Sequence, residues 1–78
     1  MYFVFGIIRH TGATIYVGKG EGDLQSYQFK IENERLALMV ERDRKAGYPD
    51  FTIGLIAENL TEDEADELVR DKRADYNL

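Results

Sequence analysis

Three short segments of the chain have apolar patterns that are typical of β-strands. Residues 1–8 are apolar on both faces and rich in aromatic and β-branched side chains, which predicts a central, well-covered strand. Residues 14–18 follow a turn at residues 9–12 and complete an antiparallel hairpin. On this second strand we expect Ile15 and Val17 to share one face and Thr14 and Tyr16 the other. Residues 51–57 alternate in the same way and predict a third strand.

The middle of the chain has helical periodicity. Leu36, Met39 and Val40 recur at the spacing of one helix face, which predicts a helix over residues 33–46. Gly47 is placed to end this helix, because glycine adopts the left-handed conformation of a helix C-cap. Asp23 is placed to cap a shorter helix over residues 24–31. The pattern leaves open whether these two helical pieces form one bent helix.

A second helix start follows the third strand. Asn59 is expected to turn the chain, and Thr61 with Glu64 three residues later forms a capping-box pattern. The acidic run over residues 62–67 is either a binding surface for a basic partner or, the interpretation we favour, the first turns of a helix that continues through Val69 toward Tyr76. The order β-β-α-β-α predicts a single α+β domain over residues 1–78, with a small three-stranded antiparallel sheet and helices packed on it.

Composition narrows the class of partner. Ten basic residues and fifteen acidic ones leave a net charge of −5, which opposes binding to a nucleic-acid backbone and favours a protein or a small ligand. The chain has no cysteine, which suits a reducing, cytoplasmic location. No apolar run approaches the roughly 20 residues of a membrane span, so we expect no membrane partner.

Candidate binding chemistry centres on the second strand and the residues after it. Gly18, Gly20 and Gly22 alternate around Lys19, and we expect a loop whose glycines adopt positive φ and let a partner approach. The binding candidates are Arg9, His10, Tyr16, Lys19, Tyr27 and Lys30. The plain structural alternatives are a strand aromatic for Tyr16, a solvated loop lysine for Lys19 and an exposed turn side chain for His10.

Several segments, in matching order and spacing, resemble the GIY-YIG nuclease superfamily over nearly the whole chain. The sequence YVGKG at residues 16–20 stands where the second signature tripeptide belongs, and FVF at residues 3–5 replaces the first. Residues 42–47, 51–57 and 60–65 resemble the branch that includes the animal ankyrin-repeat and LEM-domain nucleases. The resemblance implies a β-β-α-β-α core with the signature tripeptides on its first hairpin.

The resemblance also implies the parts of a phosphodiester-cutting site. In that family a tyrosine or an activated water attacks or deprotonates, and an arginine of the first helix stabilises charge on the phosphate. A single glutamate on a later helix holds one divalent ion. These parts lower the barrier by nucleophile activation, charge stabilisation and Lewis acidity, respectively.

This chain departs from the family at most of those positions. Phe5 has no hydroxyl where the first tyrosine belongs, although Tyr16 remains. No arginine follows the glycine segment within a turn, and the nearest basic residues are Lys30 and Arg35. Val69 falls at the position of the metal-binding glutamate, and valine cannot hold a hard cation that prefers oxygen ligands.

We therefore expect no catalytic residue, no metal and no cofactor, and we favour a catalytically degenerate domain that acts by binding. Its partner would be a protein, and it would serve as a small regulator or inhibitor of the kind a virus or mobile element encodes. One alternative is an active endonuclease that uses Tyr16, Lys19 and a substitute ligand, Glu67, with Mg²⁺ or Mn²⁺, in a homodimer that completes the site. A second alternative is a non-cutting nucleic-acid-binding module.

Overall fold

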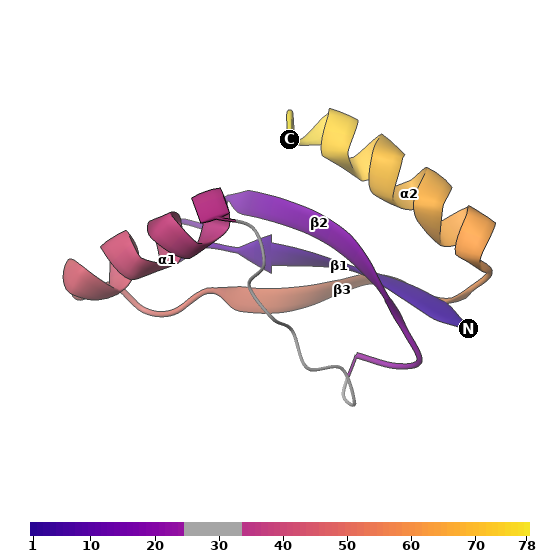
Figure 1. Cartoon of the computed structure of the whole chain (residues 1–78), viewed down its shortest axis with the longest axis horizontal. Helices are drawn as coiled ribbons and strands as arrows, with labels where there is room; N and C mark the ends of the chain where they lie inside the picture. Colours follow the sequence, from indigo (N-terminus) through magenta and orange to yellow (C-terminus); the bar gives the residue numbers. More distant parts are fainter. Residues whose placement is uncertain (25–33) are drawn as a thin grey trace.

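The computed structural model describes residues 1–24 and 34–78 and has the expected α+β architecture. Three antiparallel strands form one sheet in the order β2-β1-β3, with two helices (Figure 1). The elements are β1 (Tyr2–Ile8), β2 (Thr14–Glu21), α1 (Glu34–Lys45), β3 (Thr52–Leu60) and α2 (Glu62–Asp75). Nearly all of the helix expected at 24–31 lies outside the described residues. No helix in the described ranges is long and apolar enough to cross a lipid bilayer.

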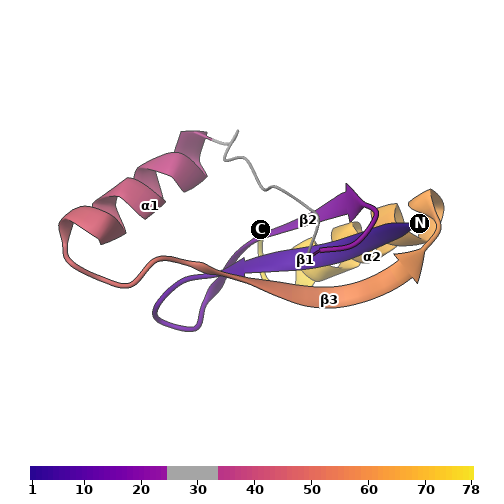
Figure 2. The same ribbon diagram turned by 90° about the horizontal axis from the view of Figure 1, so that it is seen from below.

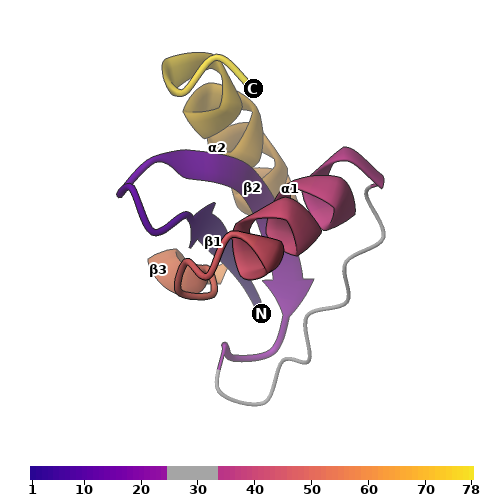
Figure 3. The same cartoon turned by 90° about the vertical axis from the view of Figure 1, so that its left-hand side faces the viewer.

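The central strand, β1, is covered on both faces, as its apolar pattern predicts. One face carries a buried cluster of Phe3, Phe5, Ile7 and Leu36 of α1. The opposite face carries Val4, Val17 and Ala65 of α2. The two helices therefore pack on opposite faces of the sheet, α1 toward the hairpin turn and α2 beginning near the N-terminus (Figure 2 and Figure 3).

The glycine-spaced segment is strand, not loop, and this corrects the expectation above. In the β1–β2 pair Phe5 lies opposite Gly18 and Phe3 opposite Gly20. Neither glycine has positive φ, whereas Gly22, just after the strand, does at 92°. A Cβ on Gly18 would lie 3.2 Å from Phe5 Cζ. Glycine is used here because aromatic rings cover the backbone closely.

A bulge changes which residues of β2 share a face. The register shifts between the pairs Ile7–Tyr16 and Ile8–Thr14, so Ile15 is the extra residue. Ile15 and Tyr16 both pack against the cluster on the α1 face, while Val17 belongs to the α2 face. The prediction that Ile15 and Val17 share a face is therefore wrong, because strict alternation fails at a bulge.

β3 is longer than its alternating pattern indicated. It continues through Asn59, which was expected to turn the chain, and ends at Leu60. Asn59 has φ of 59° and lies where the β1–β3 register is irregular, between Tyr2 and Val4. Asparagine tolerates the left-handed conformation, so the strand absorbs the residue without ending.

Both helix boundaries that depend on caps agree with the sequence pattern. Gly47 has φ of 83° and its N–H donates to the Arg44 carbonyl at 3.0 Å, as in a Schellman ending of α1. At the start of α2, the Thr61 side chain accepts from the Glu64 N–H, and the Glu64 carboxylate accepts from the Thr61 N–H. Glu64 of the acidic run therefore caps the start of α2, as expected.

Candidate functional site

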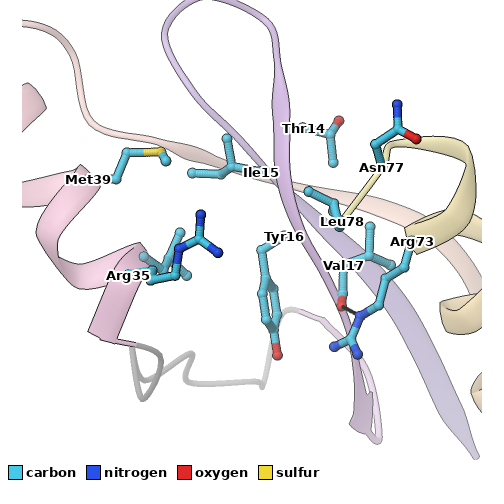
Figure 4. Close-up of a pocket in the computed structure, with 10 residues that line it drawn as sticks. Thr14, Ile15, Tyr16, Val17, Arg35, Met39, Arg73, Asn77 and Leu78 are labelled. Atoms are coloured by element: carbon cyan, nitrogen blue, oxygen red, sulfur yellow. Dashed lines mark hydrogen bonds between the residues drawn. The ribbon is translucent and has the colours of Figure 1, made fainter.

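A cavity of about 450 Å³ lies beside β2, between α1 and the end of α2 (Figure 4). Its lining residues are Thr14, Ile15, Tyr16, Val17, Arg35, Leu36, Met39, Arg73, Asn77 and Leu78. Within the described part of the chain, these are apolar or neutral side chains and two arginines, with no acidic side chain. Of the sequence-predicted binding candidates that the structure describes, Tyr16 is the one that lines this cavity.

Tyr16 is held by aromatic and cationic neighbours. Its ring centroid is 6.1 Å from that of Phe5, with the planes tilted by 41°. The Arg73 guanidinium carbon lies 5.7 Å from the Tyr16 ring centroid, within the range of a cation–π contact. The ring also lies over Gly18, because a Cβ there would be 2.8 Å from Tyr16 Cε1. The absence of a side chain at Gly18 therefore sets the orientation of the phenol.

Arg73 is positioned by α2 and by the ending of that helix. Its Nε donates a hydrogen bond to the Val17 carbonyl at 3.1 Å, at the outer strand of the sheet. Asn77 has φ of 58°, and the Leu78 N–H donates to the Arg73 carbonyl at 2.8 Å, which completes a second Schellman ending. This ending brings Asn77 and Leu78 to the cavity beside Arg73.

Both cavity arginines were missed as site residues in the sequence. Arg73 follows Ala65 and Val69 at spacings of eight and four residues, on the helix stripe that packs against the sheet. Arg35 directly precedes Leu36, a buried residue of α1. Figure 4 shows Arg35 and Arg73 on opposite sides of Tyr16. The signal available in the sequence was a cation adjoining a buried helix face.

Lys19 lies away from the cavity lining and is engaged by acidic side chains of α2. Its Nζ is 2.5 Å from Asp66 Oδ1 and 3.5 Å from Glu62 Oε1, and it lies 5.4 Å from the Tyr2 ring centroid. The hydrogen bond to Asp66 raises the pKa of the Lys19 ammonium. Tyr2 Oη donates to Glu62 Oε2 at 3.0 Å, which raises the pKa of that phenol. Lys19 is thus neither a solvated loop lysine nor part of the cavity.

Arg9 and His10 form a separate cluster at the hairpin turn. Arg9 makes two hydrogen bonds to the Asp43 carboxylate, Nε to Oδ2 at 2.9 Å and a terminal nitrogen to Oδ1 at 2.7 Å. These bonds hold the pKa of Asp43 below its ordinary value and raise the pKa of Arg9. His10 stacks on Tyr48 with ring centroids 4.1 Å apart, and its side chain is only 16% exposed. The expectation of an exposed turn histidine is wrong, because this cluster ties the hairpin to the end of α1.

The positions discussed for metal binding lie on different faces of α2. Val69 packs with the cluster of Val4, Val17 and Ala65, whereas Glu67 is exposed. Within the described residues, no three histidine or acidic side chains are grouped so that they could hold a metal ion. Tyr27 and Lys30 lie outside the described residues. The described binding candidates therefore lie in three places: Tyr16 at the cavity, Lys19 beside α2, and Arg9 with His10 at the hairpin turn.

The cavity chemistry is that of an anion-binding surface with a partly apolar lining. Two guanidiniums supply planar hydrogen-bond donors, which match carboxylate and phosphate groups. The Tyr16 phenol supplies a polar group between them. Comparisons of the chain with models of protein families, with curated proteins and with solved structures gave no match.

Proposed function

We propose that this protein is a non-catalytic binding domain on a GIY-YIG-like scaffold and that its partner is another protein. The observation that carries the proposal is the packing of the partly buried Val69 against the cluster of Val4, Val17 and Ala65, at the position where the resemblance places the metal-binding glutamate. A small regulator or inhibitor in a reducing compartment, the cytoplasm, is consistent with the absence of cysteine from the sequence.

The surroundings of Tyr16 support binding over phosphodiester hydrolysis. Metal-dependent hydrolysis needs an oxygen ligand close to the reacting phosphate, so that the ion polarises it or activates a water. The described residues around Tyr16 are instead cationic, apolar or uncharged polar, and Phe5, which packs against its ring, has no hydroxyl. This arrangement stabilises a bound anion without offering a carboxylate to a divalent ion.

One specific observation favours the alternative, a working endonuclease. Arg35 of α1 lines the same cavity as Tyr16, so a helix arginine does lie beside the remaining signature tyrosine. In the family that pair belongs to the cutting site. A substitute acid would then have to come from Glu67 or from a second copy of the chain.

A cleavage assay separates the two functions. The purified protein is incubated with plasmid and with single-stranded DNA in Mg²⁺ or Mn²⁺, beside the variants Tyr16→Phe and Tyr48→Phe. Tyr48 is exposed and does not line the cavity, so Tyr48→Phe is a matched control that also removes one phenol hydroxyl. We expect no cleavage by any of the three proteins. Metal-dependent cleavage that disappears in Tyr16→Phe and persists in Tyr48→Phe would overturn the proposal.

A second measurement tests metal affinity directly. Calorimetric titration with Mg²⁺ or Mn²⁺ should show no site, because Val69 supplies no oxygen ligand. Binding that is lost in Glu67→Gln, with the fold retained, would instead support the endonuclease with a substitute ligand.

A further inference from the structure

We propose that the cavity beside β2 binds an extended acidic segment of the partner protein, with carboxylates of that segment held by Arg35 and Arg73. The inference rests on the proposed binding function and names the chemistry of the partner. The charge of the cavity indicates an acidic ligand, because two arginines line it and no acidic side chain among the described residues does. This contrasts with the protein as a whole, whose net charge is −5.

The charge of Arg73 is not neutralised within the described part of the chain. Its contacts there are the Val17 carbonyl and the face of Tyr16, both uncharged. Four other cations lie in ion pairs: Arg9 with Asp43, Lys19 with Glu62 and Asp66, Arg44 with Asp50, and Lys45 with Glu41. Arg42, Arg70 and Lys72 do not line the cavity. Arg73 therefore offers its full positive charge to a ligand in the cavity, beside a second guanidinium.

The shape and lining of the cavity suit a peptide. β2 is an outer strand of the sheet, and outer strands present backbone groups to which an extended segment can pair. Ile15, Leu36 and Met39 give the cavity an apolar part of its lining. A segment in which acidic residues alternate with apolar ones places carboxylates at the guanidiniums and an apolar side chain against this part of the lining.

A nucleic-acid strand fits the same surface less well. Nucleic-acid affinity arises from many contacts between cations and phosphates along a backbone. Here Arg9, Lys19 and Arg44 are each paired with an acidic side chain, so they add little to a continuous positive track for such a backbone. The remaining field of the acidic protein opposes a polyanion. The peptide is therefore the favoured ligand, and DNA is the competing outcome.

Selection from a phage-displayed library of short random peptides tests the inference. We expect peptides with acidic residues separated by apolar ones to be enriched on the wild-type protein. A selected peptide, labelled for fluorescence anisotropy, should lose about tenfold in affinity when either Arg35→Gln or Arg73→Gln is introduced, because one charged hydrogen-bonded contact is removed. Arg44→Gln, which removes the same charge outside the cavity, should leave the affinity unchanged.

Three results would overturn the inference. The first is a selection that enriches no peptide, or peptides without acidic residues. The second is an affinity that is the same for Arg73→Gln as for wild type, or the same for a peptide in which glutamine replaces glutamate. The third is tight binding of single-stranded DNA that the arginine substitutions abolish while no peptide binds. Each leaves the cleavage assay untouched, so failure of this inference is distinguishable from failure of the non-catalytic function.

Discussion

Replacing Gly18 by alanine tests the close packing that orients the candidate site. The new Cβ would lie 2.8 Å from Tyr16 Cε1 and 3.1 Å from the Tyr16 hydroxyl. It would also lie 3.2 Å from Phe5 Cζ. Gly18 has no positive φ, so the substitution does not strain the backbone itself. The ring of Tyr16 must therefore move, although Phe5 on one side and Arg73 on the other hold it.

The expected effect is a difference between two opposing contributions. Overpacking of this kind typically costs 1–3 kcal/mol, so we take about 2 kcal/mol for the displaced ring. Alanine in place of glycine lowers the entropy of the unfolded chain and returns about 0.4–1 kcal/mol. The net loss is therefore about 1–1.5 kcal/mol, and each kcal/mol lowers the Tm of a domain of this size by roughly 4–8 °C.

Thermal and urea unfolding, followed by circular dichroism, measure the effect. Gly6→Ala is the matched control, because its Cβ would meet its nearest neighbour at 3.5 Å, an ordinary contact. A second background, Tyr16→Leu, removes the ring atoms that the new Cβ would meet. In that background Gly18→Ala should cost much less free energy of unfolding than it does in the wild type. The reasoning is refuted if Gly18→Ala is as stable as Gly6→Ala, or if it loses the same stability in the Tyr16→Leu background.

Predictions at three further positions follow from the ion pairs and caps. Asp43→Asn should lower the urea midpoint at neutral pH. The difference from wild type should shrink as the pH falls below 3.8, because Arg9 lowers the pKa of the Asp43 carboxyl and the stabilising carboxylate becomes protonated as the pH falls through that lowered pKa. Thr61→Ala should lose about 1 kcal/mol in urea unfolding and Thr61→Ser almost none, since serine keeps the capping oxygen; equal losses would contradict the cap. Lys19→Gln should leave the anisotropy titration of an acidic peptide unchanged, and a loss as large as that of Arg73→Gln would show that the wrong cation was assigned.

The sequence predicted those structural features that depend on residues close together in the chain. The α+β order, the central place of β1, the Gly47 ending and the capping box of Thr61 and Glu64 were all predicted, and the structure has them. Caps and strand patterns depend on residues a few positions apart, so a single segment contains the information needed.

The sequence pattern did not predict the features that depend on contacts between strands. The bulge that turns Ile15 to the face of Tyr16 depends on the pairing register with β1. The strand conformation of Gly18 depends on Phe5 lying opposite it, which a glycine-rich segment read alone does not reveal. Alternation and glycine spacing are therefore reliable only until another strand imposes its register.

The sequence by itself determined the elements, their order and the excess of negative charge, because these follow from local propensity and composition. Only the tertiary structure decided which cations remain available to a ligand. Lys19 and Arg9 are prominent in the sequence, yet each meets a carboxylate from a helix far along the chain. Arg73 meets a backbone carbonyl and an aromatic ring instead, and so keeps its charge at the cavity. Ion pairing is set by distance in space, and that distance exists only once helices and sheet have packed.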